Sequence, residues 1–380
     1  MRKMRVGVIC DFAEDRWYSM DLIGDMLVWH LNRDFAASIE ATQIRPAMKS
    51  RFGHLPRKAD QFVNRFHEYP RLIRKIRGDF DVFHIVDHSY AHLVHDLPAD
   101  KTVVTCHDLD AFRCLIEPER DPRSPVFRAM ARRILRGLRK AARVACVSHT
   151  VEDEIASRGL LPPGRTTVVP NGVHPSCSAT PDPEADADAT RLLGPWREGA
   201  TDLLHVGTTA PRKRIEALLE IFAQVRARVP NARLIRAGGP FTPAQAELAS
   251  RLGLTGAIAV MPYLERPTLA AVYRRAAMVL LPSDSEGFGL PVVEAMACGT
   301  PIIASDLPVL REVGGSAAHY SQVNDVGAWS ARILELLSMR NDKAAWERIR
   351  ASALLRAGQF SWENNTNRLV QIYNLLLAGR

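Results

Sequence analysis

The sequence predicts an α/β protein with two domains, each containing a parallel, doubly wound β-sheet. Short apolar runs alternate with longer amphipathic runs along the chain, which is typical of repeated β-α-β units. The chain has 380 residues, a length that favours two domains over one. A stretch rich in proline, aspartate, alanine and serine interrupts the alternation at residues 174–190, and this composition is typical of a linker.

The alternation divides the expected elements into two series. In the first we expect strands at Arg5–Cys10, Asp81–Val86, Thr102–Cys106 and Arg143–Val147, and helices at Asp21–Leu31, Gln61–Ile76, Val126–Lys140 and His149–Arg158. In the second we expect strands at Leu203–Val206, Ala232–Ala237, Ala257–Met261, Met278–Leu281 and Pro301–Ala304, and helices at Ile215–Arg228, Pro243–Leu252, Thr268–Arg275 and Pro291–Ala297. The expected domains are therefore residues 1–173 and 191–358, with a linker at 174–190 and a C-terminal helical segment at 359–380.

The composition is that of an ordinary globular protein, with 47% hydrophobic and 24% charged residues. No apolar stretch is long enough to cross a bilayer. The basic N-terminus precedes an apolar run, Val6–Cys10, that is too short for the core of a signal peptide. We therefore expect a cytoplasmic protein. The six cysteines form no C-x-x-C pair, which favours reduced, mostly buried thiols over disulfides or a zinc site.

The formal net charge is +8, and the basic residues gather in two regions. One region is Arg45–Arg77, where only Asp60 and Glu68 oppose the positive charge, and the other is the predicted helix Val126–Lys140. An anionic membrane surface or a phosphorylated acceptor would suit such charge, and a solvated face would explain it equally well. No nucleic-acid-binding motif accompanies the charge, so we expect no nucleic acid partner.

The most informative segment is Ser283–Ser305, which follows a predicted buried strand. It contains a Gly-Phe-Gly-Leu-Pro turn between Glu286 and Glu294, and a predicted helix begins after the turn. Ligands of open parallel sheets bind beyond the carboxyl ends of the strands, and a helix N-terminus favours an anion such as phosphate. Glycines let the backbone approach a ligand closely, and carboxylates accept strong hydrogen bonds from sugar or ribose hydroxyls.

A second glycine turn follows the first strand of the second series. The segment His205–Arg214 places Gly207 four residues before Pro211, with Arg212 and Lys213 directly after the proline. Arginine presents a planar fork of donors and lysine a compact charge. The segment is therefore well placed to hold a diphosphate at the end of a strand.

The run Glu286–Pro301 resembles the donor-site signature of the retaining glycosyltransferases of family 4, also called glycosyl transferases group 1. These enzymes have the GT-B fold, two Rossmann-like domains that face a cleft. The turn at Gly207 is similar to the family's Gly-x-x-x-Pro-Arg-Lys donor loop, although Thr208 stands where many members have arginine. The resemblance implies catalytic roles for Arg212, Lys213 and Glu286. The residues that it implies in donor binding are Gly207, Thr208, Tyr263, Gly287, Phe288, Gly289, Leu290 and Glu294.

The resemblance extends to the first domain, where the strand ending in His107-Asp108 is similar to the family's strand that ends in His-Asp. It implies that His107 is catalytic and orients the donor sugar. Many members also have a glycine pair after the first strand, whereas this chain has none there. We expect Trp17 and Tyr18, which follow that strand, to offer aromatic faces to a sugar on the acceptor side.

Two further features of the sequence concern a possible metal site and the C-terminal helix. Asp108 and Asp110 mimic the metal-binding Asp-x-Asp of another glycosyltransferase class. We interpret this as coincidence and expect no metal site, because family 4 generally works without a metal. The segment Phe360–Trp362 and the amphipathic helix after it resemble the family's last helix, which crosses back onto the N-terminal domain.

The resemblance implies a retaining, metal-independent transfer of a hexosyl group from a nucleotide-diphosphate sugar to a hydroxyl of a glycan, glycolipid or small-molecule acceptor. The nucleotide sugar is a co-substrate, and no cofactor is expected. Retention requires either a covalent carboxylate intermediate or same-face attack with the leaving phosphate as base, and the resemblance favours the second. The alternatives are another GT-B relative, such as a sugar-nucleotide epimerase or a phosphorylase, and a non-catalytic anion- or nucleotide-binding protein. Peripheral contact with the cytoplasmic face of an anionic membrane also stays open.

Overall fold

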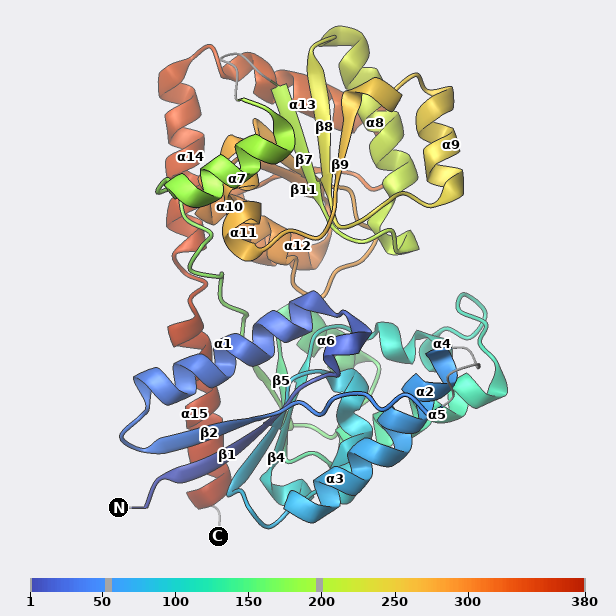
Figure 1. Cartoon of the computed structure of the whole chain (residues 1–380), viewed down its shortest axis with the longest axis vertical. Helices are drawn as coiled ribbons and strands as arrows, with labels where there is room; N and C mark the ends of the chain where they lie inside the picture. Colours follow the sequence, from blue (N-terminus) through green and yellow to red (C-terminus); the bar gives the residue numbers. More distant parts are fainter. Residues whose placement is uncertain (1, 52–56, 196–200, 379–380) are drawn as a thin grey trace. The chain divides into compact units, whose positions relative to one another are not determined.

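The computed structural model describes residues 2–51, 57–195 and 201–378, and the chain divides into two units. The first comprises Met1–Gly172 and Ser361–Arg380, and the second comprises Val173–Phe360. Each unit contains a six-stranded sheet whose neighbouring strands are parallel, and helices connect successive strands along the chain (Figure 1). The α/β fold class with two doubly wound sheets is therefore as the sequence predicts.

The first sheet has the strand order β2-β1-β3-β4-β5-β6. Its strands are β1 (Met4–Ile9), β2 (Ile39–Ile44), β3 (Val82–Ile85), β4 (Thr102–Cys106), β5 (Arg143–Cys146) and β6 (Thr166–Val168). Strand β1 pairs with β2 on one side and with β3 on the other, so the direction of winding reverses between β1 and β3. Open parallel sheets bind ligands at such a reversal, beyond the carboxyl ends of the two strands.

The helices of the first unit include two that share one core with β1. The helical elements are η1 (Ala13–Asp15), α1 (Tyr18–Asp34), α2 (Arg57–Val63), η2 (Asn64–Glu68), α3 (Tyr69–Ile76), η3 (His88–Asp96), η4 (Ala99–Lys101), η5 (Asp110–Phe112), α4 (Arg113–Ile116), α5 (Pro125–Lys140), α6 (His149–Ser157) and α15 (Trp362–Ala378). Trp362 and Tyr373 of α15 pack with Leu27 of α1 and Val8 of β1. The hydroxyl of Tyr373 also lies 2.6 Å from Nδ1 of His84 in β3. The last helix of the chain is thus part of the first unit.

The second sheet has the strand order β12-β11-β10-β7-β8-β9. Its strands are β7 (Thr201–Val206), β8 (Ala232–Ala237), β9 (Ile258–Met261), β10 (Met278–Leu281), β11 (Ile302–Ser305) and β12 (His319–Ser321). Counted from β7, this is the strand order of the Rossmann fold, and its reversal lies between β7 and β10. The pairing of Met278 with Leu203 fixes the register there.

The helices of the second unit cover this sheet. They are α7 (Pro183–Leu193), η6 (Pro211–Lys213), α8 (Ile215–Arg228), α9 (Pro243–Arg251), η7 (Thr255–Ala257), α10 (Arg266–Arg275), α11 (Leu290–Ala297), α12 (Pro308–Gly314), η8 (Gly315–Ala317), α13 (Val326–Met339) and α14 (Lys343–Ala357). Phe222 of α8 and Trp329 of α13 pack with Leu203 and Leu234 in one core. All six cysteines of the chain are buried free thiols, as the sequence predicts. None of the helices in the described residues is long and apolar enough to span a membrane.

The expected linker at 174–190 is wrong in part, because half of this segment is folded into the second unit. Helix α7 begins after Asp182, whose side chain accepts a hydrogen bond from the Ala185 N–H, and it buries Ala185, Ala189 and Leu193. These residues recur every four positions and form a narrow apolar stripe on one helical face. Because the stripe consists largely of alanine, the low hydrophobicity of the segment conceals it.

Candidate active site

Both glycine-turn motifs of the second unit lie at the reversal point of its sheet. The first motif follows β7 and contains η6, and the second follows β10 and leads into α11. The backbone N–H of Asp284 donates to the carbonyl of Arg212 over 2.8 Å, so the two loops are hydrogen-bonded to each other. The Rossmann strand order therefore brings together two segments that are far apart in the sequence.

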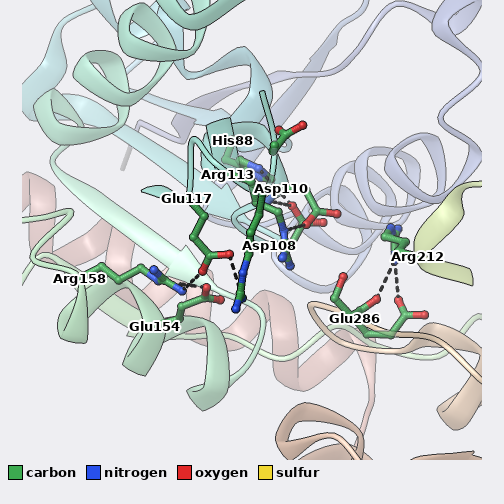
Figure 2. A network of polar contacts seen from close by, with 12 residues as sticks. His88, Asp108, Asp110, Arg113, Glu117, Glu154, Arg158, Arg212 and Glu286 are labelled. Atoms are coloured by element: carbon green, nitrogen blue, oxygen red, sulfur yellow. Dashed lines mark hydrogen bonds and ion pairs between the residues drawn. The ribbon is translucent and has the colours of Figure 1, made fainter. Parts of the chain in front are cut away.

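Arg212 and Lys213 both contact the carboxylate of Glu286. Arg212 Nη1 donates to Glu286 Oε2 over 3.1 Å, a contact that Figure 2 shows, and Lys213 Nζ donates to Oε1 over 2.5 Å. Ser283 Oγ donates to the same Oε1 over 2.7 Å. The turn that carries the two cations ends at Arg214, whose φ of 52° is left-handed. Three of the four residues predicted to be catalytic, Arg212, Lys213 and Glu286, are thus in contact.

Glu286 is ionised despite its burial. Burial acts to raise the pKa of this carboxyl, but the charges of Lys213 and Arg212 and the hydrogen bonds from Lys213 and Ser283 outweigh it, so the pKa lies below its usual value. The side chain of Glu286 is only 7% exposed and that of Lys213 only 9%. The site therefore holds a fixed anion between two cations, in surroundings where charge interactions are strong.

Helix α11 opens directly from the second loop. Its N-cap is Gly289, which has a φ of 88° and gives no side-chain cap to the first N–H groups. A Cβ on Gly289 would lie 2.6 Å from Cδ2 of Leu310, so both the backbone angle and the space favour glycine. Leu290 begins the helix, and Gly287 and Phe288 precede it in buried positions. An uncapped helix N-terminus beside two cations is suited to bind a phosphate group.

Glu294 lies one turn into α11 and points at α10 rather than at Glu286. Its Oε2 accepts a hydrogen bond of 2.8 Å from the hydroxyl of Tyr273, and its Oε1 accepts one of 3.2 Å from Arg266. Burial and the neighbouring Glu294 raise the pKa of Tyr273 well above its usual value, so the hydroxyl stays a donor. Sequence reasoning missed Tyr273 and Arg266, since no local pattern says which face of α10 meets α11.

The remaining predicted donor residues lie at the same edge of the sheet. Gly207 follows β7, and the adjacent Thr208 is exposed and accepts a hydrogen bond from the Ala210 N–H over 3.4 Å. Tyr263 follows β9 and is 43% exposed. Because β8 lies between β7 and β9, Tyr263 comes from a strand that is not adjacent to the Gly207 loop. The roles assigned to these residues stay predictions.

In the first unit, His107 follows β4 and is buried. Its Nε2 donates to the carbonyl of Val86 over 2.7 Å. Burial lowers the pKa of this imidazole, although the charge of Asp87 opposes the effect. His107 is therefore a buried imidazole held by the backbone after β3. Its catalytic role stays a prediction.

Trp17 and Tyr18 lie on the connection that leaves β1. Trp17 is the N-cap of α1 and is 59% exposed, and Tyr18, the first residue of α1, is 39% exposed. This connection starts at the β1–β3 reversal of the first sheet, where ligands of such sheets bind. Both aromatic rings are thus accessible, and their acceptor-side role stays a prediction.

A pair of buried carboxyl groups at the same reversal was not predicted. Asp11 follows β1 and Asp87 follows β3, and both are buried. Both carboxyl oxygens of Asp11 lack a hydrogen-bond partner among the described residues. Burial, with the nearby Asp87, raises the pKa of Asp11 well above its usual value. Burial would also raise the pKa of Asp87, but the neighbouring His88 and His107 and the contacts with Ser89 lower it to about 2. An acid directly after a buried strand was the signal for both residues.

The Asp-x-Asp residues take part in a local polar network (Figure 2). Asp108 Oδ1 accepts a hydrogen bond of 2.9 Å from the Asp110 N–H and lies 3.6 Å from Nε2 of His88. Arg113 Nε donates to Asp110 over 2.6 Å. Within the part of the chain that the structure describes, no group of three or more His, Cys, Asp or Glu side chains is arranged to hold a metal ion.

Comparison with known proteins places both units in one family. The family model described as Glycosyltransferase Family 4 matches residues 28–176, and the model described as Glycosyl transferases group 1 matches residues 193–351. The O-antigen chain mannosyltransferase B of Escherichia coli is 33% identical over 295 residues, which cover 75% of this chain and 72% of that protein. The D-inositol 3-phosphate glycosyltransferase of Mycolicibacterium smegmatis is 30% identical over 313 residues, which cover 79% and 68% of the two chains.

Solved structures with the same fold include a sucrose-phosphate synthase from Thermosynechococcus elongatus, with a TM-score of 0.75, 21% identity and coverage of 100% of both chains. The structure of Anabaena HepE in complex with UDP and glucose has a TM-score of 0.72 at 15% identity, covering 98% of this chain and 99% of that one. At these identities the likeness concerns the fold. Together with the family models and the curated relatives, it shows that the chain belongs to glycosyltransferase family 4 and is a glycosyltransferase with the GT-B fold.

Proposed function

We propose that this enzyme transfers a hexosyl group from a nucleotide-diphosphate sugar to a hydroxyl of a glycan, glycolipid or small-molecule acceptor, with retention of configuration and without a metal. The contact of Arg212 and Lys213 with Glu286, beside the open N-terminus of α11, is the observation that carries the proposal. The names of the relatives make a mannosyl or a glucosyl group the first choices to test, because one relative is a mannosyltransferase and one solved neighbour holds UDP and glucose. An N-acetylglucosaminyl group, a further hexosyl group, is tested after them.

The chemical step breaks the bond between C1 of the sugar and the oxygen of the terminal phosphate. Negative charge then builds on the departing diphosphate, and positive charge builds on the sugar. Arg212, Lys213 and the first N–H groups of α11 are donors fixed in advance at the place where we propose that the diphosphate leaves. One such preorganised donor is typically worth about 3–4 kcal/mol of barrier, so these groups replace the charge of a metal ion.

The contacts of Glu286 favour same-face attack over a covalent intermediate. Oε1 accepts from Lys213 and Ser283, and Oε2 accepts from Arg212. A carboxylate whose two oxygens are held in this way is a poor nucleophile, but it can still accept hydrogen bonds from sugar hydroxyls and stabilise a positive sugar ring. In same-face attack the acceptor oxygen bonds to C1 as the diphosphate leaves, and the acceptor proton passes to a departing phosphate oxygen.

Glu294 is proposed to bind the ribose of the nucleotide. Its carboxylate is fixed by Tyr273 and Arg266, and each of its oxygens has a further lone pair for a ribose hydroxyl. Fixing the carboxylate beforehand lowers the entropy lost when the nucleotide binds. The relatives reported above are named as glycosyltransferases rather than as epimerases or phosphorylases, so we do not propose either alternative.

The proposal is tested by thermal shift and by turnover. A panel of nucleoside diphosphates should contain at least one that raises the melting temperature in proportion to the logarithm of its concentration above its Kd. The matching nucleotide sugar should then be hydrolysed slowly, and NMR should show that the first-formed sugar keeps the anomeric configuration of the donor. An inverted first product would contradict retention, and the failure of every nucleotide diphosphate to bind would contradict the donor site.

We also propose that the first unit contacts an anionic membrane through α5 and the neighbouring α2–η2 segment. Arg132, Arg133 and Arg136 of α5 are exposed and have no ion-pair partner among the described residues. Beside them is a groove with exposed apolar side chains, lined by Phe62, Val63, Phe66, His67, Val126, Ala129, Met130 and Arg133. Unpaired cations beside exposed apolar groups are typical of surfaces that bind anionic lipid.

The basic residues of α3 offer a matched control for this membrane proposal. Arg71 lies 3.7 Å from Glu68, a carboxylate that also pairs with two other cations, and Arg74 lies 2.9 Å from Asp96, so part of their charge is balanced. The side chains of Arg57 and Lys58, part of the same predicted basic region, lie outside the described residues. Flotation with anionic liposomes at low salt should weaken strongly in a variant with glutamine at 132, 133 and 136, and less in one with glutamine at 71, 74 and 75. If both variants float like the wild type, or if the wild type ignores the liposomes, the membrane proposal fails.

A further inference from the structure

Arg236, at the carboxyl end of β8, is a fully buried cation that no carboxylate accompanies among the described residues. Its exposed fraction is 0%. Nη2 donates to the carbonyl of Gly207 over 3.1 Å, and Nη1 donates to the carbonyl of Gly239. Nε has no hydrogen-bond partner among the described residues, and the guanidinium lies 5.3 Å from the ring centroid of Phe241. An arginine in this state needs an explanation, because a buried charge without a counter-charge is unfavourable.

The guanidinium lies directly beneath the Gly207 loop, whose residues we propose to hold the donor diphosphate. Its bond to the Gly207 carbonyl joins β8 to the loop after β7. Gly238, with a φ of 129°, is so close to this carbonyl that a Cβ would lie 2.0 Å from the Gly207 oxygen. The two loops are therefore packed backbone against backbone, and Arg236 donates to the carbonyls on both sides of the contact.

The neighbouring His205 does not supply the missing counter-charge. It is fully buried, and neither ring nitrogen has a hydrogen-bond partner among the described residues. Burial, followed by the positive charges of Arg236 and Lys213, lowers the pKa of His205 to about 3. The imidazole is therefore neutral. The same interactions place His205 within electrostatic range of Arg236, Lys213 and Glu286 together.

Three positively charged side chains lie around this loop. Arg212, Lys213 and Arg236 are positive, and Glu286 is the carboxylate that faces the first two. Burial lowers the pKa of Arg236 to about 10, so it is still protonated at neutral pH. Arg214 and Asp284, 3.5 Å apart, balance each other. Arg236 therefore adds a buried positive charge beside the loop that no carboxylate among the described residues accompanies, and the negative charge of a bound diphosphate would compensate it.

We propose that Arg236 is a positioning residue of the donor site whose buried charge is compensated by the diphosphate of the bound donor. It holds the carbonyls of Gly207 and Gly239, and so the shape of the loop, and it adds a positive charge that solvent screens little. This inference rests on the donor site proposed above. The buried charge of Arg236 would then make the site bind a diphosphate more tightly than a monophosphate or an uncharged nucleoside.

Two conservative variants separate the charge of Arg236 from its hydrogen bonds. Arg236→Lys keeps the charge, and Arg236→Gln keeps a two-hydrogen donor without the charge. With the nucleoside diphosphate found in the panel as probe, Arg236→Gln should raise Kd by at least about tenfold, because a buried charge acts strongly at this range. Arg236→Lys should keep most of the affinity, and the Kd of the matching nucleoside should change little in either variant. Arg251→Gln, an exposed arginine of α9 in the same unit, is the matched control and should bind like the wild type.

Each outcome of the experiment has a separate meaning. If Arg236→Gln binds the nucleoside diphosphate with the affinity of the wild type, whatever Arg236→Lys does, the charge of Arg236 does not contribute to diphosphate binding and the inference fails. If the wild type itself binds no nucleoside diphosphate, the proposed function fails instead.

A second measurement covers the case in which neither Arg236 variant folds. Inorganic pyrophosphate should compete with the nucleoside diphosphate for the wild type, and singly charged anions should compete at least about tenfold less well. A site that does not distinguish pyrophosphate from singly charged anions does not use the buried charge of Arg236 to favour a diphosphate, and that result overturns the inference.

Discussion

Replacing Lys213 by methionine tests the assignment of the donor site. It also allows the contribution of Lys213 to catalysis to be measured apart from its contribution to stability. The substitution keeps the length of the side chain and removes the charge that lies 2.5 Å from Glu286. Removing one partner of a buried ion pair typically costs about 3–5 kcal/mol. Since Arg212 and Ser283 still contact Glu286, we expect a loss of about 2–3 kcal/mol. That loss lowers the melting temperature by roughly 5–10 °C for a unit of this size.

The stability loss should depend on pH in a defined direction. Lys213 helps to hold the pKa of Glu286 below its usual value, so its contribution is present above the unfolded pKa of a glutamate and is lost as pH falls through the folded pKa. The difference in free energy of unfolding between wild type and Lys213→Met should therefore be full at pH 7. It should shrink as pH falls below the unfolded glutamate pKa of about 4.3 and disappear below the lowered folded pKa of Glu286.

A double variant separates the two roles of Lys213. In Lys213→Met/Glu286→Gln the buried carboxylate is removed together with its partner, so much of the lost stability should return. Turnover should not return. We expect kcat to fall at least about a hundredfold in Lys213→Met, as for the loss of one preorganised donor, and to stay low in the double variant.

The assays are thermal denaturation between about pH 2 and pH 8, which spans the titration of a glutamate whose pKa is lowered, and the rate of nucleotide release from the donor. Lys343→Met, an exposed lysine at the start of α14 in the same unit, is the control and should match the wild type in both assays. Near-normal turnover by a folded Lys213→Met enzyme would refute the assignment of the donor diphosphate to this loop. A stability loss that does not change with pH would refute the pairing with Glu286.

Three further predictions follow from the structure. Gly289→Ala should lower stability by about 1–2 kcal/mol, measured by denaturant unfolding, because φ is 88° and the new Cβ would lie 2.6 Å from Leu310; an unchanged midpoint would contradict this. Asp11→Asn should raise the melting temperature at pH 7–8 but not near pH 3. The raised pKa of Asp11 makes the wild-type fold lose stability as pH rises above the unfolded pKa, and a gain independent of pH would contradict the reasoning. Turnover in excess chelator should be unchanged, and loss of activity that manganese restores would assign a metal site instead.

The sequence predicts the centre of each sheet better than its edges. Strand β10 was expected at Met278–Leu281 and lies there, and α11 was expected one residue shorter than it is. Strands buried on both faces are continuous apolar runs and are easy to recognise. The three-residue strands β6 and β12 and the partly polar β2 are at or near sheet edges. These strands have so few apolar residues that their sequences look like those of loops, and the sequence pattern does not predict them.

The site residues that belong to continuous sequence motifs were predictable. Arg212, Lys213 and Glu286 come from two recognisable runs, and the Rossmann strand order brings the runs together. Tyr273 and Arg266 could not be predicted, since their contact with Glu294 depends on how α10 packs against α11. Asp11 and Asp87 each follow a predicted buried strand, but their proximity could not be predicted, because these strands become neighbours only when the winding of the first sheet reverses. The role of Arg236 could not be predicted either, because its burial beneath a glycine loop has no local signature in the sequence.

An experimental structure of the enzyme with a nucleoside diphosphate bound would show directly whether Arg212, Lys213 and α11 form the donor site. We predict that the terminal phosphate lies within hydrogen-bonding distance of Arg212, Lys213 and the first backbone N–H groups of α11, and that Glu286 makes no phosphate contact. We also predict that the ribose hydroxyls contact Glu294. A nucleotide bound elsewhere, or one whose phosphates contact neither Arg212 nor Lys213, would contradict the donor site proposed for this glycosyltransferase.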